Sequence, residues 1–215
     1  MVSRIRDAEA KYHRPKQSVA LLAVSKAQRR REIEYAIDAG QRHFGENYLQ
    51  EALEKINVLQ KHEVIWHFIG SIQSNKTRLI AENFSWIHGI SRIEIAEQLN
   101  KYRPVNLPLL NVCVQVNISK ENTKNGVSLR ELSSLVMAID ALERLQLRGL
   151  MAMPAPIQNF LEQRSIYQSV ARAQCKLIEK GFTLDTLSMG MSDDFEAAIA
   201  AGSNMVRIGK AIFGI

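Results

Sequence analysis

The chain has few cysteines and no long apolar run, and both features narrow its class. Cys113 and Cys175 are the only cysteines in 215 residues, with no CxxC pair or Cys/His cluster of zinc spacing. We expect both thiols to be buried, in a reducing compartment. No apolar run approaches the roughly 20 residues of a membrane helix, and residues 1–16 lack the apolar core of a signal peptide. These absences predict a cytoplasmic protein without a metal site or a membrane partner.

The charge balance is basic but not concentrated. Lys and Arg number 28 against 22 Asp and Glu, which leaves a net charge of +6. Such a balance attracts anions: nucleic acid, an acidic membrane surface or phosphorylated small molecules. The densest basic run, residues 29–31, is followed at once by Glu32 and Glu34. That mixture is typical of a solvated helix face, so we expect no nucleic-acid partner.

Short apolar runs alternate with helix-period stretches along the whole chain. The predicted strands are residues 19–24, 43–45, 64–69, 86–88, 109–117, 145–151, 186–189 and 205–208. The predicted helices are residues 3–12, 30–39, 46–60, 73–83, 91–101, 128–142, 160–180 and 193–201, with a short last one at 211–213. Ser128 is expected to cap its helix, with Glu131 completing a capping box.

This alternation predicts an α/β fold. Near-continuous apolar strands are typical of parallel strands covered by helices. Eight βα units in slightly more than 200 residues fit a single-domain (β/α)8 TIM-type barrel spanning residues 1–215, with residues 1–16 as a leading helix and linker. A doubly wound open sheet is the rival, but no GxGxxG follows the first strand, which weakens its dinucleotide-binding version.

Lys26 directly follows the first predicted strand, and active sites of such barrels lie at the C-terminal ends of the strands. One interpretation is an ordinary surface lysine. The other is a nucleophile that forms a Schiff base with an aldehyde. A free lysine amine is protonated at neutral pH, because its pKa is about 10.4. Desolvation, or a second cation such as Arg207, would favour the reactive neutral amine.

The ends of the last two strands resemble a phosphate site. The loops after strands seven and eight commonly bind phosphate in these barrels. Here the seventh strand continues into residues 188–192 (SMGMS), with Ser192 or Asp193 expected at the next helix N-cap, and the eighth into residues 207–210 (RIGK). Glycines allow the backbone to approach a phosphate, and helix N-termini bind it. The alternative is that these glycines only make turns.

Other polar residues near the strands are expected to be structural. His67 lies within an apolar strand and is read as a hydrogen-bonded interior histidine. Asp193 and Asp194 are explained better as acids at a helix N-terminus than as a metal pair. Four methionines near strand ends either line a pocket or fill the core: Met151, Met153, Met189 and Met191.

Seven stretches, in order and over almost the whole chain, resemble the pyridoxal phosphate homeostasis proteins. They are residues 22–26 (LAVSK), 44–48 (FGENY), 66–76 (WHFIG and QSNK), 116–126 (VNIS with Lys124 and Gly126), 149–154 (GLMAMP), 187–194 (LSMGMSDD) and 206–214 (VRIG and AIFG). The resemblance implies the barrel of the alanine racemase N-terminal domain, which is fold type III of the pyridoxal-phosphate proteins.

The resemblance also implies the cofactor, pyridoxal 5'-phosphate, and its contacts. The cofactor would be held as an aldimine on Lys26, with Asn47 beside it and Arg207 facing the pyridine nitrogen. Ser192, Gly209 and Lys210 would hold the phosphate. Ser188 and Met189, at the end of the seventh strand, complete the expected set.

Three positions depart from the family pattern. Gln28 stands where a second lysine is common, and this puts in doubt any transfer of the cofactor through a lysine there. Ser71 replaces a common proline. Lys210 replaces a Ser or Thr whose hydroxyl would bind phosphate. Either the Lys210 ammonium substitutes as a point charge, or its side chain turns to solvent and the backbone N–H binds the phosphate, and we favour the backbone. Lys124 matches the family, and it is either a secondary acceptor of the cofactor or a solvent lysine.

The resemblance implies a carrier that serves intracellular pyridoxal phosphate homeostasis and delivery, without established turnover. An always-charged arginine at the ring nitrogen would disfavour the pyridinium and weaken the electron sink. The alternative is a racemase-like enzyme, but racemisation needs a second proton-transfer group, and no convincing one is found. Apo-enzymes that receive the cofactor are the expected partners, and the family favours a monomer.

Overall fold

Eight parallel strands close into one barrel in chain order, as predicted. The computed structural model describes residues 1–118 and 126–214. The barrel closes where β1 pairs with β8, in the register Ala20–Met205 to Ala23–Ile208. The strands are β1 (Ala20–Val24), β2 (His43–Glu46), β3 (Ile65–Phe68), β4 (Trp86–Ile90), β5 (Leu110–Val116), β6 (Leu145–Ala152), β7 (Thr186–Met189) and β8 (Met205–Ile208).

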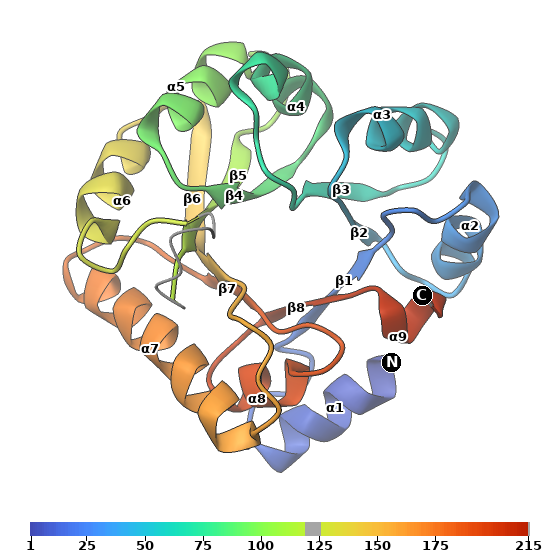
Figure 1. The fold of residues 1–215 in the computed structure, drawn as a ribbon. Helices are drawn as coiled ribbons and strands as arrows, with labels where there is room; N and C mark the ends of the chain where they lie inside the picture. Colours follow the sequence, from blue (N-terminus) through green and yellow to red (C-terminus); the bar gives the residue numbers. More distant parts are fainter. Residues whose placement is uncertain (119–125, 215) are drawn as a thin grey trace.

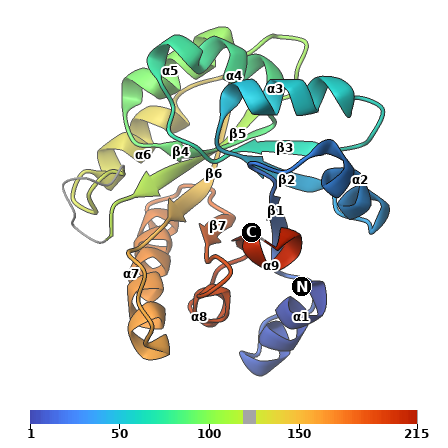
Figure 2. The same cartoon turned by 45° about the vertical axis from the view of Figure 1, so that its right-hand side comes forward.

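Helices surround the barrel and cover the outer faces of its strands (Figures 1 and 2). Helix α1 lies beside α8 on the outside of the barrel. Among the described residues, no helix has both the length and the apolar character needed to cross a membrane. The helical segments are α1 (Val2–Lys11), α2 (Arg30–Asp38), α3 (Leu49–Val58), η1 (Ser74–Lys76), α4 (Thr77–Asn83), α5 (Ile93–Tyr102), α6 (Leu132–Asp140), α7 (Phe160–Glu179), α8 (Phe195–Ala200) and α9 (Lys210–Phe213).

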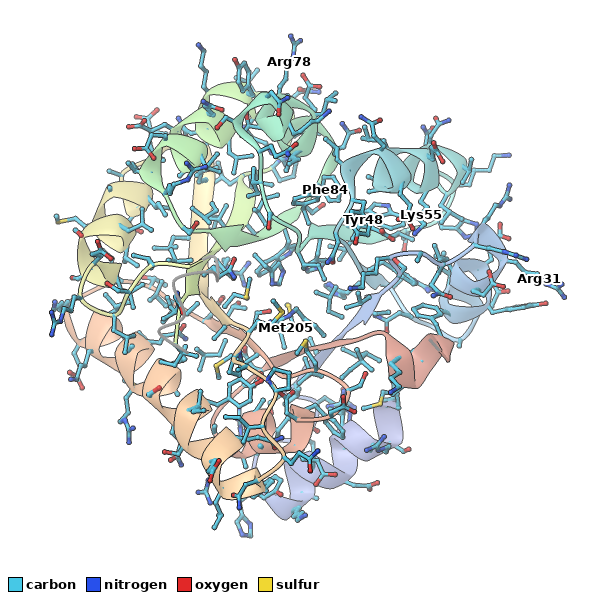
Figure 3. All side chains as sticks on the ribbon, in the orientation of Figure 1. Arg31, Tyr48, Lys55, Arg78, Phe84 and Met205 are labelled. Carbon is cyan, nitrogen blue, oxygen red and sulfur yellow. The ribbon has the colours of Figure 1, made fainter. Side chains whose placement is uncertain are left out.

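Two different environments lie on the two faces of the strands. Between strands and helices the side chains are apolar, and Phe84, labelled in Figure 3, is among the largest that are fully buried, with Phe44 and Phe68. Inside the barrel a small apolar cluster of Trp86, Cys113 and Met151 adjoins buried polar side chains. Burial of the apolar side chains between strands and helices stabilises the barrel by the hydrophobic effect. The buried polar side chains beside the small cluster lie inside the barrel, below the C-terminal ends of the strands.

Several helix starts differ from the prediction, among them those of α3, α6 and α8. Helix α3 begins at Leu49 and not at Glu46, because Glu46 ends β2 and is buried. Helix α6 begins at Leu132 with Glu131 as its N-cap residue, so the prediction of Ser128 as the cap was wrong. The Glu131 carboxylate accepts the Ser128 hydroxyl at 2.6 Å and not the Ser128 backbone N–H of a capping box. Asp194 is the N-cap residue of α8, so the assignment of Ser192 or Asp193 was wrong. The Asp194 carboxylate instead closes the preceding turn, where it accepts the N–H of Met191 at 2.6 Å.

The two cysteines differ in exposure. Cys113 is fully buried inside the barrel, and burial raises the pKa of its thiol to about 12. Cys175 is exposed on α7, so the prediction that both thiols are buried was wrong for this residue. A helix 20 residues long has both a core face and a solvent face, and Cys175 lies on the solvent face.

Glu9 fixes the leading helix to the start of β1. It is 2% exposed, accepts the backbone N–H groups of Gln17 at 3.0 Å and Val19 at 2.8 Å, and pairs with Arg6. Burial alone would raise the pKa of Glu9, but Arg6 and the two N–H groups together hold it below its usual value. The charged Glu9 carboxylate is therefore the group that joins α1 to the residues that precede β1.

We expect Glu9→Gln to lower the free energy of unfolding at pH 7 by about 2 kcal/mol, because hydrogen bonds to a charged group are lost. A depressed carboxyl pKa contributes stability above its unfolded value and loses it as the pH falls. The difference between wild type and variant should therefore shrink below about pH 4.5. Urea unfolding followed by circular dichroism at several pH values measures it. A difference independent of pH would contradict the assigned role of the charge.

Candidate cofactor-binding site

A large cavity lies at the C-terminal ends of the strands, where sites of (β/α)8 barrels are expected. Its volume is about 700 Å³. The residues that line it come from strand ends and loops far apart in sequence: Val24, Lys26, Ala27, Asn47, Tyr48, Ile69, Gly70, Ser71, Gln115, Met151, Met153, Met191, Ser192, Asp193, Arg207, Gly209 and Lys210.

The structure brings six of the eight predicted site residues onto this cavity: Lys26, Asn47, Ser192, Arg207, Gly209 and Lys210. The other two, Ser188 and Met189, are fully buried and do not line it. They are neighbours on β7, so their side chains point to opposite faces. Ser188 lies inside the barrel against Arg207, whereas Met189 packs in the apolar layer under the helices. Lys124 lies outside the described residues.

Lys26 is presented by a tight turn after β1. The N–H of Gln28 donates to the carbonyl oxygen of Ser25 at 3.0 Å, which closes a four-residue turn around Lys26. Ala27 has a φ of 59°, a conformation that costs an L-residue about 1–2 kcal/mol. Its N–H donates to the Glu51 carboxylate at 2.6 Å, and this bond holds the turn in place.

A buried charged cluster lies directly behind that turn. The Lys55 ammonium on α3 donates to Glu46 at 2.8 Å, to Glu51 at 2.5 Å and to the carbonyl oxygen of Ser25 at 2.6 Å. The Ser25 hydroxyl also donates to Glu46 at 2.5 Å. Burial raises the pKa of Glu46, while Lys55 and Ser25 oppose that rise. One ammonium thus connects helix α3, strand β2 and the residue preceding Lys26.

Asn47 and Gly70 form a close backbone contact on the next side of the cavity. A Cβ atom on Gly70 would lie 2.1 Å from the carbonyl oxygen of Asn47, so only glycine fits there. The side-chain oxygen of Asn47 is buried and has no hydrogen-bond partner. A buried acceptor without a donor costs about 1–3 kcal/mol, and a bound ligand with an N–H or O–H group would remove that cost.

The loops after β7 and β8 meet at the opposite side. The Ala211 N–H, in the first turn of α9, donates weakly to the Ser192 hydroxyl at 3.4 Å. Gly209 precedes this turn, and a Cβ there would lie 3.2 Å from the carbonyl oxygen of Val24. Backbone N–H groups at such a helix start suit a phosphate. Lys210 is exposed, so its ammonium is available at the rim of the cavity.

Arg207 places a buried positive charge at the cavity. It is 5% exposed, and burial lowers its pKa. Its guanidinium donates to the carbonyl and hydroxyl oxygens of Ser188 at 2.5 and 2.8 Å and to the carbonyl oxygen of Ala152 at 2.9 Å. Within residues 1–118 and 126–214, no carboxylate forms an ion pair with it. A guanidinium has five N–H groups, so donors remain for an anionic or acceptor-bearing ligand. The Asp194 carboxylate acts on this charge without an ion pair and opposes the lowering of the Arg207 pKa.

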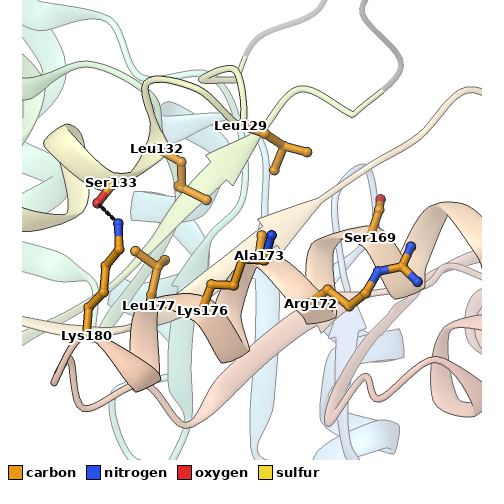
Figure 4. Close-up of a pocket in the computed structure, with 9 residues that line it drawn as sticks. All are labelled: Leu129, Leu132, Ser133, Ser169, Arg172, Ala173, Lys176, Leu177 and Lys180. Carbon is orange, nitrogen blue, oxygen red and sulfur yellow. Dashed lines mark hydrogen bonds between the residues drawn. The ribbon is translucent and has the colours of Figure 1, made fainter.

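A smaller cavity of about 340 Å³ lies between α6 and α7, away from the strand ends (Figure 4). Three basic residues, Arg172, Lys176 and Lys180, project along α7, and the Lys180 ammonium donates to the Ser133 hydroxyl at 3.1 Å. This surface lacks the buried polar groups of the larger cavity, which is therefore the candidate functional site.

Comparison with known proteins identifies the family. Residues 3–215 match the family model described as alanine racemase, N-terminal domain. The "Pyridoxal phosphate homeostasis protein" of Escherichia coli K12 is 52% identical over 214 residues, which are 98% of this chain and 92% of that protein. The chain belongs to the pyridoxal phosphate homeostasis protein family. The protein of the same name from Pseudomonas aeruginosa is 49% identical over 214 residues, covering 100% of this chain and 92% of that one.

Solved structures of other proteins have the same barrel. PipY of Synechococcus elongatus, solved with PLP bound, is 33% identical with a TM-score of 0.85 and covers 98% of this chain and 100% of its own. Alanine racemase from Corynebacterium glutamicum is 18% identical with a TM-score of 0.72, over 97% of this chain and 60% of the racemase. The likeness to the racemase shows the fold alone.

Proposed function

We propose that this chain binds pyridoxal phosphate through Lys26 and holds it for delivery to other proteins, without turnover of its own. The observation that carries the proposal is the cavity that Lys26 shares with the buried cation Arg207. The names of the relatives and the PLP-bound PipY structure support the choice of ligand. Pyridoxal phosphate supplies an aldehyde that condenses reversibly with an amine and releases one water.

The residues present fit that ligand. Lys26 supplies an amine that can attack the aldehyde, and the bond from the Ala27 N–H to Glu51 fixes the turn that carries it. Gly209 and Ser192 flank the backbone N–H groups that would hold the phosphate, and Lys210 adds a positive charge at the rim. Arg207 is the candidate to face the ring nitrogen. The unpartnered oxygen of Asn47 provides an acceptor at the same cavity.

The absence of turnover rests on the charge of Arg207. A guanidinium stays protonated, and beside the ring nitrogen it opposes protonation there, which weakens the electron-withdrawing power of the ring. The structure offers one feature for a racemase-like alternative. Tyr48 is the only phenol among the described residues of the cavity lining and is 61% exposed, so it could serve as a second proton-transfer group.

Borohydride reduction of the cofactor-incubated protein, followed by peptide mass mapping, tests the proposal. We expect a pyridoxyl adduct on the peptide that contains Lys26. Absence of both the adduct and a visible absorption band would contradict cofactor binding. A racemase assay with several amino acids then separates the two functions. Turnover that disappears in both Lys26→Ala and Tyr48→Phe would establish the enzyme instead of the carrier.

The remaining parts of the proposal concern the context of the protein. The carrier would act as one barrel unit and as a monomer in the cytoplasm, with apo-enzymes as recipients of the cofactor and without nucleic acid. Transfer from the loaded protein to an apo-enzyme, compared with transfer from an equal amount of free pyridoxal phosphate, tests the delivery role. Equal rates would favour buffering over direct delivery.

A further inference from the structure

A continuous line of hydrogen bonds crosses the barrel interior and ends at Arg207. His43 Nδ1 lies 2.9 Å from His67 Nε2, and His67 Nδ1 lies 2.9 Å from His88 Nε2. His88 Nδ1 lies 2.8 Å from the Ser188 hydroxyl, which is 2.8 Å from Arg207 Nη1. These residues stand on β2, β3, β4, β7 and β8, so the line spans the barrel from one side to the other. We name it the histidine relay.

The interior of the relay is closed to solvent. His67, His88 and Ser188 have no exposed surface, and only His43, the first residue of β2, is partly exposed. Trp86 stacks on His67 with 5.4 Å between ring centroids. Burial lowers the pKa of all three histidines, and for His88 the charge of Arg207 adds to that effect and brings the pKa to about 3. The three imidazoles are therefore neutral at pH 7.

The chemistry of Arg207 fixes the direction of every bond in the relay. A guanidinium is only a donor, so the Ser188 oxygen accepts from Arg207. Among the described residues, His88 Nδ1 is the other partner of this oxygen, so the Ser188 hydroxyl donates its proton to His88 Nδ1. A neutral imidazole whose Nδ1 accepts carries its proton on Nε2. His88 therefore donates to His67 Nδ1, and His67 in turn donates through Nε2 to His43 Nδ1. All hydrogen bonds of the relay therefore run in one direction, from Arg207 toward His43. The Arg207 guanidinium at the cavity end has no acceptor atom, so it cannot take up a proton from the relay.

We propose that Ser188 and His88, ordered by His67 and His43, are positioning residues that hold Arg207 for the cofactor ring. The relay gives the buried guanidinium an oriented acceptor without a carboxylate, so its charge stays available to the cavity. A carboxylate at Ser188 would neutralise that charge. This inference rests on the proposed function, because it assigns the relay a role in binding pyridoxal phosphate.

The polarity can be tested without the cofactor. Nitrogen-15 NMR of the cofactor-free protein distinguishes the two imidazole tautomers and the protonated form. We expect His88, His67 and His43 to carry the proton on Nε2 at pH 7. In Ser188→Ala, His88 loses its donor, and a change of its tautomer signal is expected. A proton on Nδ1 of His88 in the wild-type protein would overturn the relay, whether or not pyridoxal phosphate binds.

A second set of variants tests whether the histidine relay affects the binding of pyridoxal phosphate. Ser188→Ala and His88→Leu should each weaken pyridoxal phosphate binding about tenfold, the size expected for a lost bond to a charged group. They should also shift the absorption maximum of the bound cofactor, because the charge near the ring moves. His88→Gln keeps an N–H donor and an acceptor oxygen, so it should recover most of the affinity. His62→Leu, outside the relay, is the control.

The outcomes separate the relay from the proposed function. A loss of thermal stability in His88→Leu with unchanged affinity and an unchanged absorption maximum would overturn the positioning role and leave only a structural one. Failure of the wild-type protein to bind pyridoxal phosphate would contradict the proposed function. In that case the tautomers of the cofactor-free protein would still decide the polarity of the relay.

Discussion

Replacement of Lys26 by alanine is expected to abolish the borohydride-stable adduct while the barrel stays folded. Lys26 is partly exposed and follows the buried end of β1, so its removal leaves no cavity in the core. The turn that carries it is held by backbone bonds at Gln28 and Ala27, which the substitution keeps. The phosphate contacts also remain, so the variant should retain weaker, non-covalent binding. Mass spectrometry measures the adduct, and thermal unfolding checks the fold.

Lys210→Ala is the matched control, because Lys210 lines the same cavity and could react in place of Lys26. This variant should retain the full adduct on Lys26 and lose affinity by less than about tenfold, because an exposed charge is worth about 1 kcal/mol or less. An undiminished adduct in Lys26→Ala would refute the assigned nucleophile. Its position in the peptide map would then identify the true one.

The strand pattern was strongly encoded in the sequence. The predicted ranges for β7 and β8 agree with the structure to the residue, and the closed order of strands follows from the repeated βα rhythm. Runs of apolar residues bounded by polar loops are enough for this, because parallel strands are covered by helices. The helix starts were harder, because polar residues such as Glu46 are compatible with either the end of a strand or a first helical turn.

The expectation that the site lies at the C-terminal ends of the strands identified most of the candidate site residues. It could not tell which residues of β7 face the barrel interior and which face the helices. All four residues of that strand are buried, so no alternation of polarity distinguishes Ser188, inside the barrel, from Met189, under the helices. Gln115 was missed for a related reason. It lies within β5 and lines the cavity. Its sequence signal is weak, because Asn111 is a second amide in the same apolar strand.

The charged cluster behind Lys26 had no sequence signal that marks it as buried. Lys55 and Glu51 are four residues apart, which is the spacing of an ordinary solvent-exposed ion pair on a helix. Only the tertiary fold brings Lys55 on α3 to Glu46 on β2, and it reduces the Lys55 side chain to 8% exposure. Burial of this kind depends on tertiary contacts, which periodicity does not contain.

Lys55→Met is therefore expected to lower the free energy of unfolding by about 3–5 kcal/mol, because it leaves the fully buried carboxyl of Glu46 without its cation. Methionine retains most of the apolar stem, so the loss reports the charge. The variant also loses the bond to Ser25, which should loosen the Lys26 turn and reduce the adduct yield. Urea unfolding and quantitative borohydride trapping measure the two effects. Lys61→Met, at an exposed lysine, should change neither.

The pH dependence of the free energy of unfolding, together with a second substitution, shows whether the unpaired charge of Glu46 causes the instability of Lys55→Met. A carboxyl whose pKa is raised by folding stabilises the fold at low pH, and this contribution is lost as the pH rises. Burial already raises the pKa of Glu46, and removal of Lys55 should raise it further. The defect of Lys55→Met should therefore shrink as the pH falls. Adding Glu46→Gln should restore much of the stability at pH 7, because a neutral amide needs no cation. A double variant no more stable than Lys55→Met would show that lost packing, and not the unpaired charge, causes the defect.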